Sequence, residues 1–120
     1  MANPFVHVEL TTGDLTKSKD FYGKLFDWKF QDVPVGSGES YTVIQVGEGT
    51  GGGMFQMSAA PPMWLSYVLV DDIRAATQKA LSLGAKIHKE NHEVPGMGWF
   101  TIFSDPQGAT LALWQAKAKG

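Results

Sequence analysis

The stretch FVHVELTTGDLTKSKDFYGKLFDW, residues 5–28, decides the fold because its periodicity changes once. Aliphatic residues at positions 6, 8 and 10 alternate with His7 and Glu9, and this period of two predicts a strand with the aliphatic side chains inward. After Asp14, apolar residues recur every three or four positions as far as Phe26, and an aspartate in that place can cap a helix. The stretch therefore predicts a strand followed by a helix.

The same order of elements is predicted twice. Three short strands should follow the first helix, and a new apolar strand starts the second half, where Asp71 or Asp72 can cap a helix that ends before Gly84. A shift of 58 positions, taken from the sequence, places Asp14 on Asp72. We expect one α+β domain, residues 1–120, made of two β-α-β-β-β units of about residues 1–58 and 59–120, with curved mixed sheets and helices on their convex side. The predicted strands after the helices are WKFQDVPV, SYTVIQV and GGMFQM, then AKIHKE, GWFTIFS and ATLALWQ.

Composition excludes several classes of partner. The net charge is −2 and the ten Lys and Arg residues are scattered, so we expect no nucleic-acid partner. No apolar run approaches the roughly 20 residues of a membrane span, and the first residues do not form a signal peptide. We therefore expect no membrane partner and a cytoplasmic location. The chain has no cysteine, which leaves His, Asp and Glu as its strong metal ligands.

The chain resembles the vicinal oxygen chelate superfamily, the group of glyoxalases, bleomycin-resistance proteins and extradiol dioxygenases, over essentially its whole length. The resemblance lies in DL followed by FY and F-x-W within residues 14–28, in VDDI at residues 70–73, and in DPQG at residues 105–108 before the last strand. It implies paired β-α-β-β-β units and a ligand bound in the concave face of the sheet, opposite the helices.

The resemblance also implies positions for a metal, and this sequence fills few of them. Family members typically hold the metal through the first and last strands of each unit, and His7 falls on the first such position. The equivalent in the second half is Leu65, and the last-strand positions are Ala112 and about Met54. A divalent site normally needs three or four donors. We therefore expect no cofactor and no conventional metal, although a divalent ion completed across a dimer interface stays open.

His7 and Glu9 form the one candidate for acid–base chemistry. They lie two residues apart on one face of a strand, about 6.6 Å along it, so they could share an ion or a hydrogen bond. A paired carboxylate would fix the imidazole tautomer and raise its basicity, which would make His7 a general base and both residues catalytic. The alternative is that His7 lines a ligand pocket or only packs there.

Aromatic residues extend the candidate ligand site. Tyr67 and Trp114 have the strand parity of Leu65 and Ala112 and could stack a planar ligand, although core packing explains aromatic side chains equally well. Trp99 follows a glycine-rich loop, and Gln56 is the polar residue nearest to Met54. The candidate ligand-binding residues are His7, Glu9, Met54, Gln56, Tyr67, Trp99, Ala112 and Trp114.

These observations favour a glyoxalase-like or bleomycin-resistance-like protein that binds a small apolar or aromatic molecule in a concave pocket. We expect a homodimer, because single-module relatives often pair two chains. One alternative is a metal-dependent lyase, isomerase or dioxygenase of the same superfamily that uses His7 with Glu9. A second alternative is a regulatory or partner-binding module.

Overall fold

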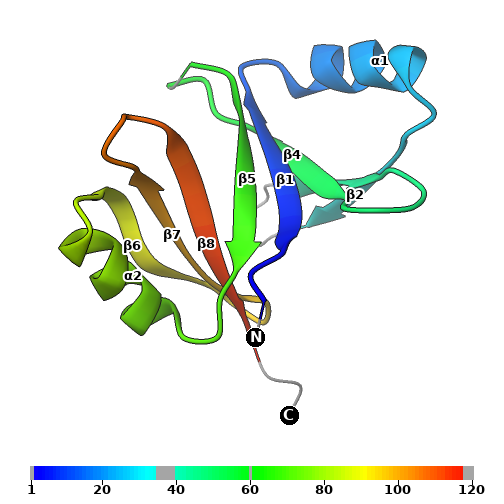
Figure 1. Cartoon of the computed structure of the whole chain (residues 1–120). Coiled ribbons are helices and arrows are strands. Elements are labelled where there is room, and N and C mark those ends of the chain that lie inside the picture. Colours follow the sequence, from blue (N-terminus) through cyan, green and yellow to red (C-terminus); the bar gives the residue numbers. More distant parts are fainter. Residues whose placement is uncertain (1, 35–39, 60, 118–120) are drawn as a thin grey trace. The chain divides into compact units, whose positions relative to one another are not determined.

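The computed structural model describes residues 2–34, 40–59 and 61–117. They form two compact units. We call His7–Leu65 the N-terminal unit, and Met1–Val6 together with Ser66–Gly120 the C-terminal unit. Each unit contains one helix and most of a run of four neighbouring strands of the eight-stranded sheet, and we call each run the sheet of that unit (Figure 1). The first residues of two strands, Phe5–Val6 and Met63–Leu65, fall in the other unit.

The N-terminal sheet has the strand order β2-β3-β4-β1. β4 runs parallel to β1, whereas β3 is antiparallel to both of its neighbours. The elements are β1 (Phe5–Thr12), α1 (Leu15–Leu25), β2 (Lys29–Pro34), β3 (Ser40–Gln45) and β4 (Gly52–Gln56).

Local sequence explains where α1 begins and which side of the sheet it covers. The Asp14 carboxylate accepts the Lys17 backbone N–H at 3.0 Å, which satisfies one of the donors that a helix start leaves unpaired. Leu10, Ile44 and Met54 form the buried core of this unit, and side chains of α1 and β2 pack against it. The partly buried side chains at this core are Leu15, Tyr22, Trp28, Phe30 and Val46.

The C-terminal sheet repeats this plan with the strand order β5-β8-β7-β6. β8 runs parallel to β5 and antiparallel to β7, and β6 is antiparallel to β7. Asp72 caps α2 by accepting the Ala75 N–H at 3.1 Å. The elements are β5 (Met63–Leu69), α2 (Ile73–Ser82), β6 (Lys86–Val94), β7 (Gly98–Ser104) and β8 (Thr110–Ala116).

The predicted fold class is confirmed: the chain is α+β and consists of two β-α-β-β-β units with mixed sheets. Asp72, and not Asp71, is the second helix cap. Val35, the last residue of the first predicted WKFQDVPV strand, lies outside the described residues. Within the described ranges, neither helix has the length and apolar character needed to cross a membrane.

Candidate functional site

Alternation along β1 divides the N-terminal sheet into two faces. Val8 and Leu10 point to the side covered by α1, where Leu10 is 5% exposed and belongs to the core. His7 and Glu9 therefore point to the opposite side of the sheet. The two faces carry different chemistry, one polar and hydrogen-bonded, the other aromatic and apolar.

Tyr41 joins His7 to Glu9 on the polar face. Its hydroxyl oxygen lies 2.7 Å from Nε2 of His7 and donates to Oε1 of Glu9 at 2.9 Å. Nε2 of His7 and Oε1 of Glu9 are 3.8 Å apart, too far for a direct hydrogen bond. The His7 and Glu9 side chains are only 32% and 15% exposed, so water competes weakly with these bonds.

A glycine in β4 allows Tyr41 to reach β1. β4 lies between β3 and β1, and its Gly53 stands opposite Glu9 on one side and Val43 on the other. A Cβ atom at position 53 would overlap the Tyr41 hydroxyl and the ring carbon that carries it. Only glycine therefore leaves room for the phenol ring to lie across β4.

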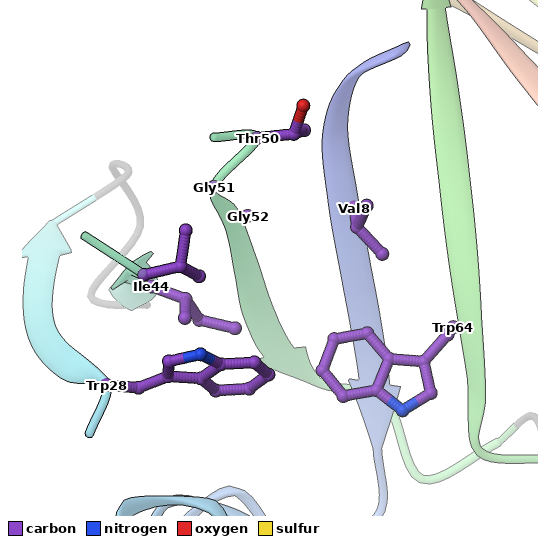
Figure 2. A pocket seen from close by; sticks show the side chains of 8 residues that line it. Val8, Trp28, Ile44, Thr50, Gly51, Gly52 and Trp64 are labelled. Carbon is purple, nitrogen blue, oxygen red and sulfur yellow. The ribbon is translucent and has the colours of Figure 1, made fainter. Parts of the chain in front are cut away.

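The aromatic face holds a pocket of about 280 Å³. Figure 2 shows the indoles of Trp28 and Trp64 at one end of this pocket and Thr50 at the other. None of the described residues that line it is charged. The lining residues are Val8, Trp28, Ile44, Val46, Thr50, Gly51, Gly52 and Trp64.

Packing among aromatic side chains fixes the two indoles. The Trp28 and Trp64 rings meet edge to face, with centroids 6.3 Å apart and planes at 74°. Tyr22 of α1 stacks on Trp28 at 5.8 Å, and its hydroxyl accepts the Trp64 indole N–H at 3.4 Å. Trp64 stays 39% exposed, so part of its ring faces the solvent. The indole pair thus combines a held geometry with an accessible surface.

Two of the predicted ligand residues lie on the side of α1 and not beside His7. Met54 is fully buried in the core, opposite Leu10 in β1 and Thr42 in β3. The Gln56 side chain accepts the backbone N–H of Leu15 at the start of α1. Both side chains thus have packing or capping contacts, and their role in ligand binding stays a prediction.

The remaining predicted residues belong to the C-terminal unit. Tyr67 stands opposite Ala112, and both are buried, while Trp114 stands opposite Phe100 on the same face. Trp99 pairs with Gln115, whose side chain accepts the Ile73 N–H of α2, so Trp99 lies on the helix side. The structure therefore brings Tyr67, Ala112 and Trp114 to one face and Trp99 to the other.

The positions at which the family resemblance implies a metal do not assemble a donor set. Among the described residues there is no group of three His, Cys, Asp or Glu side chains that could hold a metal ion. Nε2 of His7 lies at hydrogen-bonding distance from the Tyr41 hydroxyl. The donors present thus fit a hydrogen-bonded array better than a metal site, and the absence of a resident metal stays a prediction.

Sequence reasoning missed three residues of these sites. Tyr41 lies 32 positions from Glu9, and its role depends on strand order and on Gly53. Trp28 and Trp64 were visible as tryptophans at the starts of strands, but their approach across the unit requires the tertiary fold. The Gly52–Gly53 pair beside the alternating β1 was the one available signal of a close strand contact.

With this geometry in view, comparison with known proteins assigns the chain to a family. The sequence model of the Glyoxalase/Bleomycin resistance protein/Dioxygenase superfamily matches residues 5–113, so the chain belongs to that superfamily.

Two solved structures share its fold. A hypothetical protein of Bacillus halodurans C-125 has a TM-score of 0.74 at 13% identity and covers 100% of this chain and 99% of its own. The methylmalonyl-CoA epimerase of Mycobacterium tuberculosis has a TM-score of 0.69 at 14% identity, and the match covers 95% of this chain and 88% of the epimerase chain.

Curated relatives are longer than this chain. A protein of Mycobacterium bovis named "Putative glyoxylase CFP32" is 31% identical over 115 residues, which cover 91% of this chain and 44% of that protein. The anthracycline biosynthesis protein DnrV of Streptomyces peucetius is 27% identical over 89% of this chain and 45% of its own length. The chain thus spans less than half the length of these relatives.

Proposed function

We propose that the chain binds a small, neutral, apolar or aromatic molecule in the pocket that Trp28 and Trp64 close at one end. The observation that carries this proposal is a pocket with two held indoles and no charged lining residue among those described. The pocket lies on the α1 side of the sheet and not on the face opposite the helix, where the family resemblance implies the ligand. Sites of this kind gain affinity from apolar area and orient a ligand with few polar groups.

The volume of the pocket limits the size of the ligand. A cavity of about 150 Å³ can hold benzene, and pockets for drug-sized ligands begin at about 300 Å³. A pocket of about 280 Å³ therefore suits molecules of one or two rings. The Thr50 side chain, the backbone at Gly51 and the indole N–H of Trp28 are polar groups at the wall that could orient such a ligand.

Charge should discriminate between ligands of equal size. A carboxylate buried against the indoles would lose its hydration without gaining a cationic partner from the described wall. The proposal therefore predicts that indole and naphthalene bind more tightly than indole-3-acetate and 1-naphthoate. Isothermal titration calorimetry with these four probes measures the order directly.

Two matched variants locate the binding. Trp64→Ala removes one wall of the pocket and should weaken the binding of indole by about tenfold, because an indole contributes both area and ring contacts. Trp99→Ala makes the same change on the helix side of the C-terminal sheet and should leave the affinity unchanged. Circular dichroism confirms that both variants are folded. Equal losses in the two variants, or no heat with any neutral probe, would contradict the proposal.

The hydrogen-bonded array on the opposite face favours a second candidate, an enzyme that transfers a proton through His7. An imidazole held in one orientation by a hydroxyl that also bonds to a carboxylate has a geometry suited to proton transfer. The metal-dependent form of this hypothesis is tested by incubation with Mn, Fe, Ni or Zn ions, desalting and plasma mass spectrometry. Stoichiometric metal that is lost in His7→Ala would favour a metal enzyme, whereas no retention would favour metal-free proton transfer or binding alone.

A further inference from the structure

We propose that Tyr41 is a positioning residue that holds His7 in the Nε2–H tautomer and links it to Glu9 as one hydrogen-bonded unit. This inference deepens the second candidate function, and its test measures the imidazole itself and needs no turnover. Either hypothesis can therefore fail without the other.

The direction of the hydrogen bonds fixes the tautomer. An ionised carboxylate can only accept hydrogen bonds, so the Tyr41 hydroxyl proton points to Oε1 of Glu9, 2.9 Å away. The phenol oxygen then offers its lone pairs to Nε2 of His7 at 2.7 Å. Nε2 must therefore carry a proton, and the neutral imidazole holds its lone pair on Nδ1.

Tyr41 gives this order its direction, because its hydroxyl bonds to both His7 and Glu9. Their nearest polar atoms are 3.8 Å apart, beyond the range of a hydrogen bond. Without the hydroxyl between them, the carboxylate would still attract a protonated imidazole but would not select one nitrogen of a neutral imidazole. The Tyr41 hydroxyl therefore adds hydrogen bonds of defined direction to the electrostatic attraction between His7 and Glu9.

The shape of the sheet shows that this arrangement is built into the unit. Tyr41 belongs to β3, whereas His7 and Glu9 belong to β1, and β4 separates the two strands. The phenol ring crosses β4 at Gly53, where a Cβ atom would overlap it. The array therefore depends on residues of three strands: His7 and Glu9 of β1, Tyr41 of β3 and Gly53 of β4.

The arrangement has a chemical consequence for any proton that His7 accepts. The proton goes to Nδ1, while the Nε2–H bond to Tyr41 is kept and the charge on the ring faces Glu9. The ring cannot turn over to present Nε2 without losing the bond to Tyr41. A proton-transfer reaction at this face would therefore use one nitrogen in one orientation.

Nitrogen-15 NMR of the imidazole tests the proposal. The ring nitrogens of His7 are assigned by comparison with His7→Asn, at about pH 8.5, where an ordinary imidazole is neutral. In the native chain we expect pyrrole-type Nε2, pyridine-type Nδ1 and a slowly exchanging proton on Nε2. Tyr41→Phe should raise the share of the other tautomer, which brings the two nitrogen shifts closer together, and should speed the exchange of the Nε2 proton. Tyr22→Phe, the same substitution on the aromatic face, should leave His7 unchanged.

Two outcomes would overturn the proposal. A pyridine-type Nε2 in the native chain contradicts the direction of the bonds, and this result needs no variant to be folded. Unchanged His7 shifts and exchange in a folded Tyr41→Phe chain would show that another group positions the ring. The backbone amide spectrum of β1 identifies a folded variant.

Discussion

Gly53 is the residue on which the position of Tyr41 depends. Gly53→Ala places a methyl group where the phenol oxygen lies, so the ring must move and its bonds to His7 and Glu9 must break. We expect the free energy of unfolding to fall by about 1–3 kcal/mol, as for other overpacked interiors. Urea denaturation measures this change.

Gly13→Ala is the control for that substitution, because nothing lies within 4 Å of the added Cβ and the backbone at Gly13 is not left-handed. Its unfolding free energy should change by no more than about 0.5 kcal/mol. If the two alanine variants were equally stable, the close approach of Tyr41 to β4 would be wrong.

The candidate residues show what a sequence can and cannot predict at this scale. The alternation in β1 was sufficient to place His7 and Glu9 on one face, and the structure brings them together through Tyr41. The faces of Met54 and Trp99 depend on how β4 and β7 are paired with their neighbours, and a sequence does not contain that register. To predict the contacts of Tyr41, one must know both the strand order and that Gly53 has no side chain to block the phenol ring.

At the scale of elements, Asp32 ties three parts of the N-terminal unit together. It lies in β2, accepts a hydrogen bond from Thr42 of β3 at 2.5 Å, and pairs with Lys19 of α1 at 3.0 Å. The hydrogen bond from Thr42, and then the one from Lys19, lower the pKa of Asp32 below its usual value of 3.8. The carboxylate is therefore stabilised in the folded state.

The sign of the pH dependence follows from this lowered pKa. Stability from Asp32 is present above the usual pKa and is lost as the pH falls below about 4, because the unfolded chain then binds the proton first. Asp32→Asn should cost about 0.5–1 kcal/mol at pH 7, since the half-exposed carboxylate is screened. The difference from the native chain should shrink as the pH falls further below about 4.

Urea unfolding at several pH values measures that difference. Asp27→Asn serves as the control, because the Asp27 side chain is 99% exposed and should give a constant offset. A gap between Asp32→Asn and the native chain that stays constant down to pH 2.5 would contradict the role of Asp32.

Thr77 anchors α2 to the C-terminal sheet through a buried hydrogen bond. Its hydroxyl lies 2.8 Å from that of Thr101 in β7, and both side chains are fully buried. Asn91 joins the same cluster where the register of β6 shifts and its own backbone has φ of 45°. The cluster therefore holds the helix and an irregular strand to the same point.

We expect Thr77→Val to lower the free energy of unfolding by about 1–2 kcal/mol, because it keeps the shape and leaves Thr101 without one of its partners. Thr16→Val changes an exposed threonine of α1 and should have little effect. Thermal denaturation followed by circular dichroism compares the two variants. Equal melting temperatures would mean that the buried hydroxyl pair contributes little.

Across the whole molecule, the repeat of the sequence is also a repeat of the structure. The shift of 58 positions places Phe5 and Leu15, which begin β1 and α1, on Met63 and Ile73, which begin β5 and α2. Caps and apolar periodicity are local properties, so the sequence alone predicted Asp14 as the first cap and Asp71 or Asp72 as the second, which the structure shows to be Asp72. The repeat does not extend to the candidate site, because all the residues that line the indole pocket belong to the N-terminal unit.

An apolar patch on the N-terminal unit raises the question of assembly. Phe21, Leu25 and Phe26 lie at the end of α1 and are 59%, 57% and 45% exposed. Exposed apolar clusters of this kind often mark an interface. A net charge of −2 repels a second copy only weakly. We propose that a second copy of the chain covers this patch, in agreement with the dimer expected from the family resemblance.

Leu25→Lys tests this assembly, because it places a charge at the centre of the patch and should favour the monomer. Light scattering coupled to size-exclusion chromatography should give the mass of two copies for the native chain at micromolar concentration, and of one copy for the variant. Leu83→Lys is the matched control, since Leu83 is 68% exposed at the end of α2, and it should keep the mass of two copies. A native chain with the mass of one copy at every concentration, or dissociation by both substitutions alike, would count against an interface on α1.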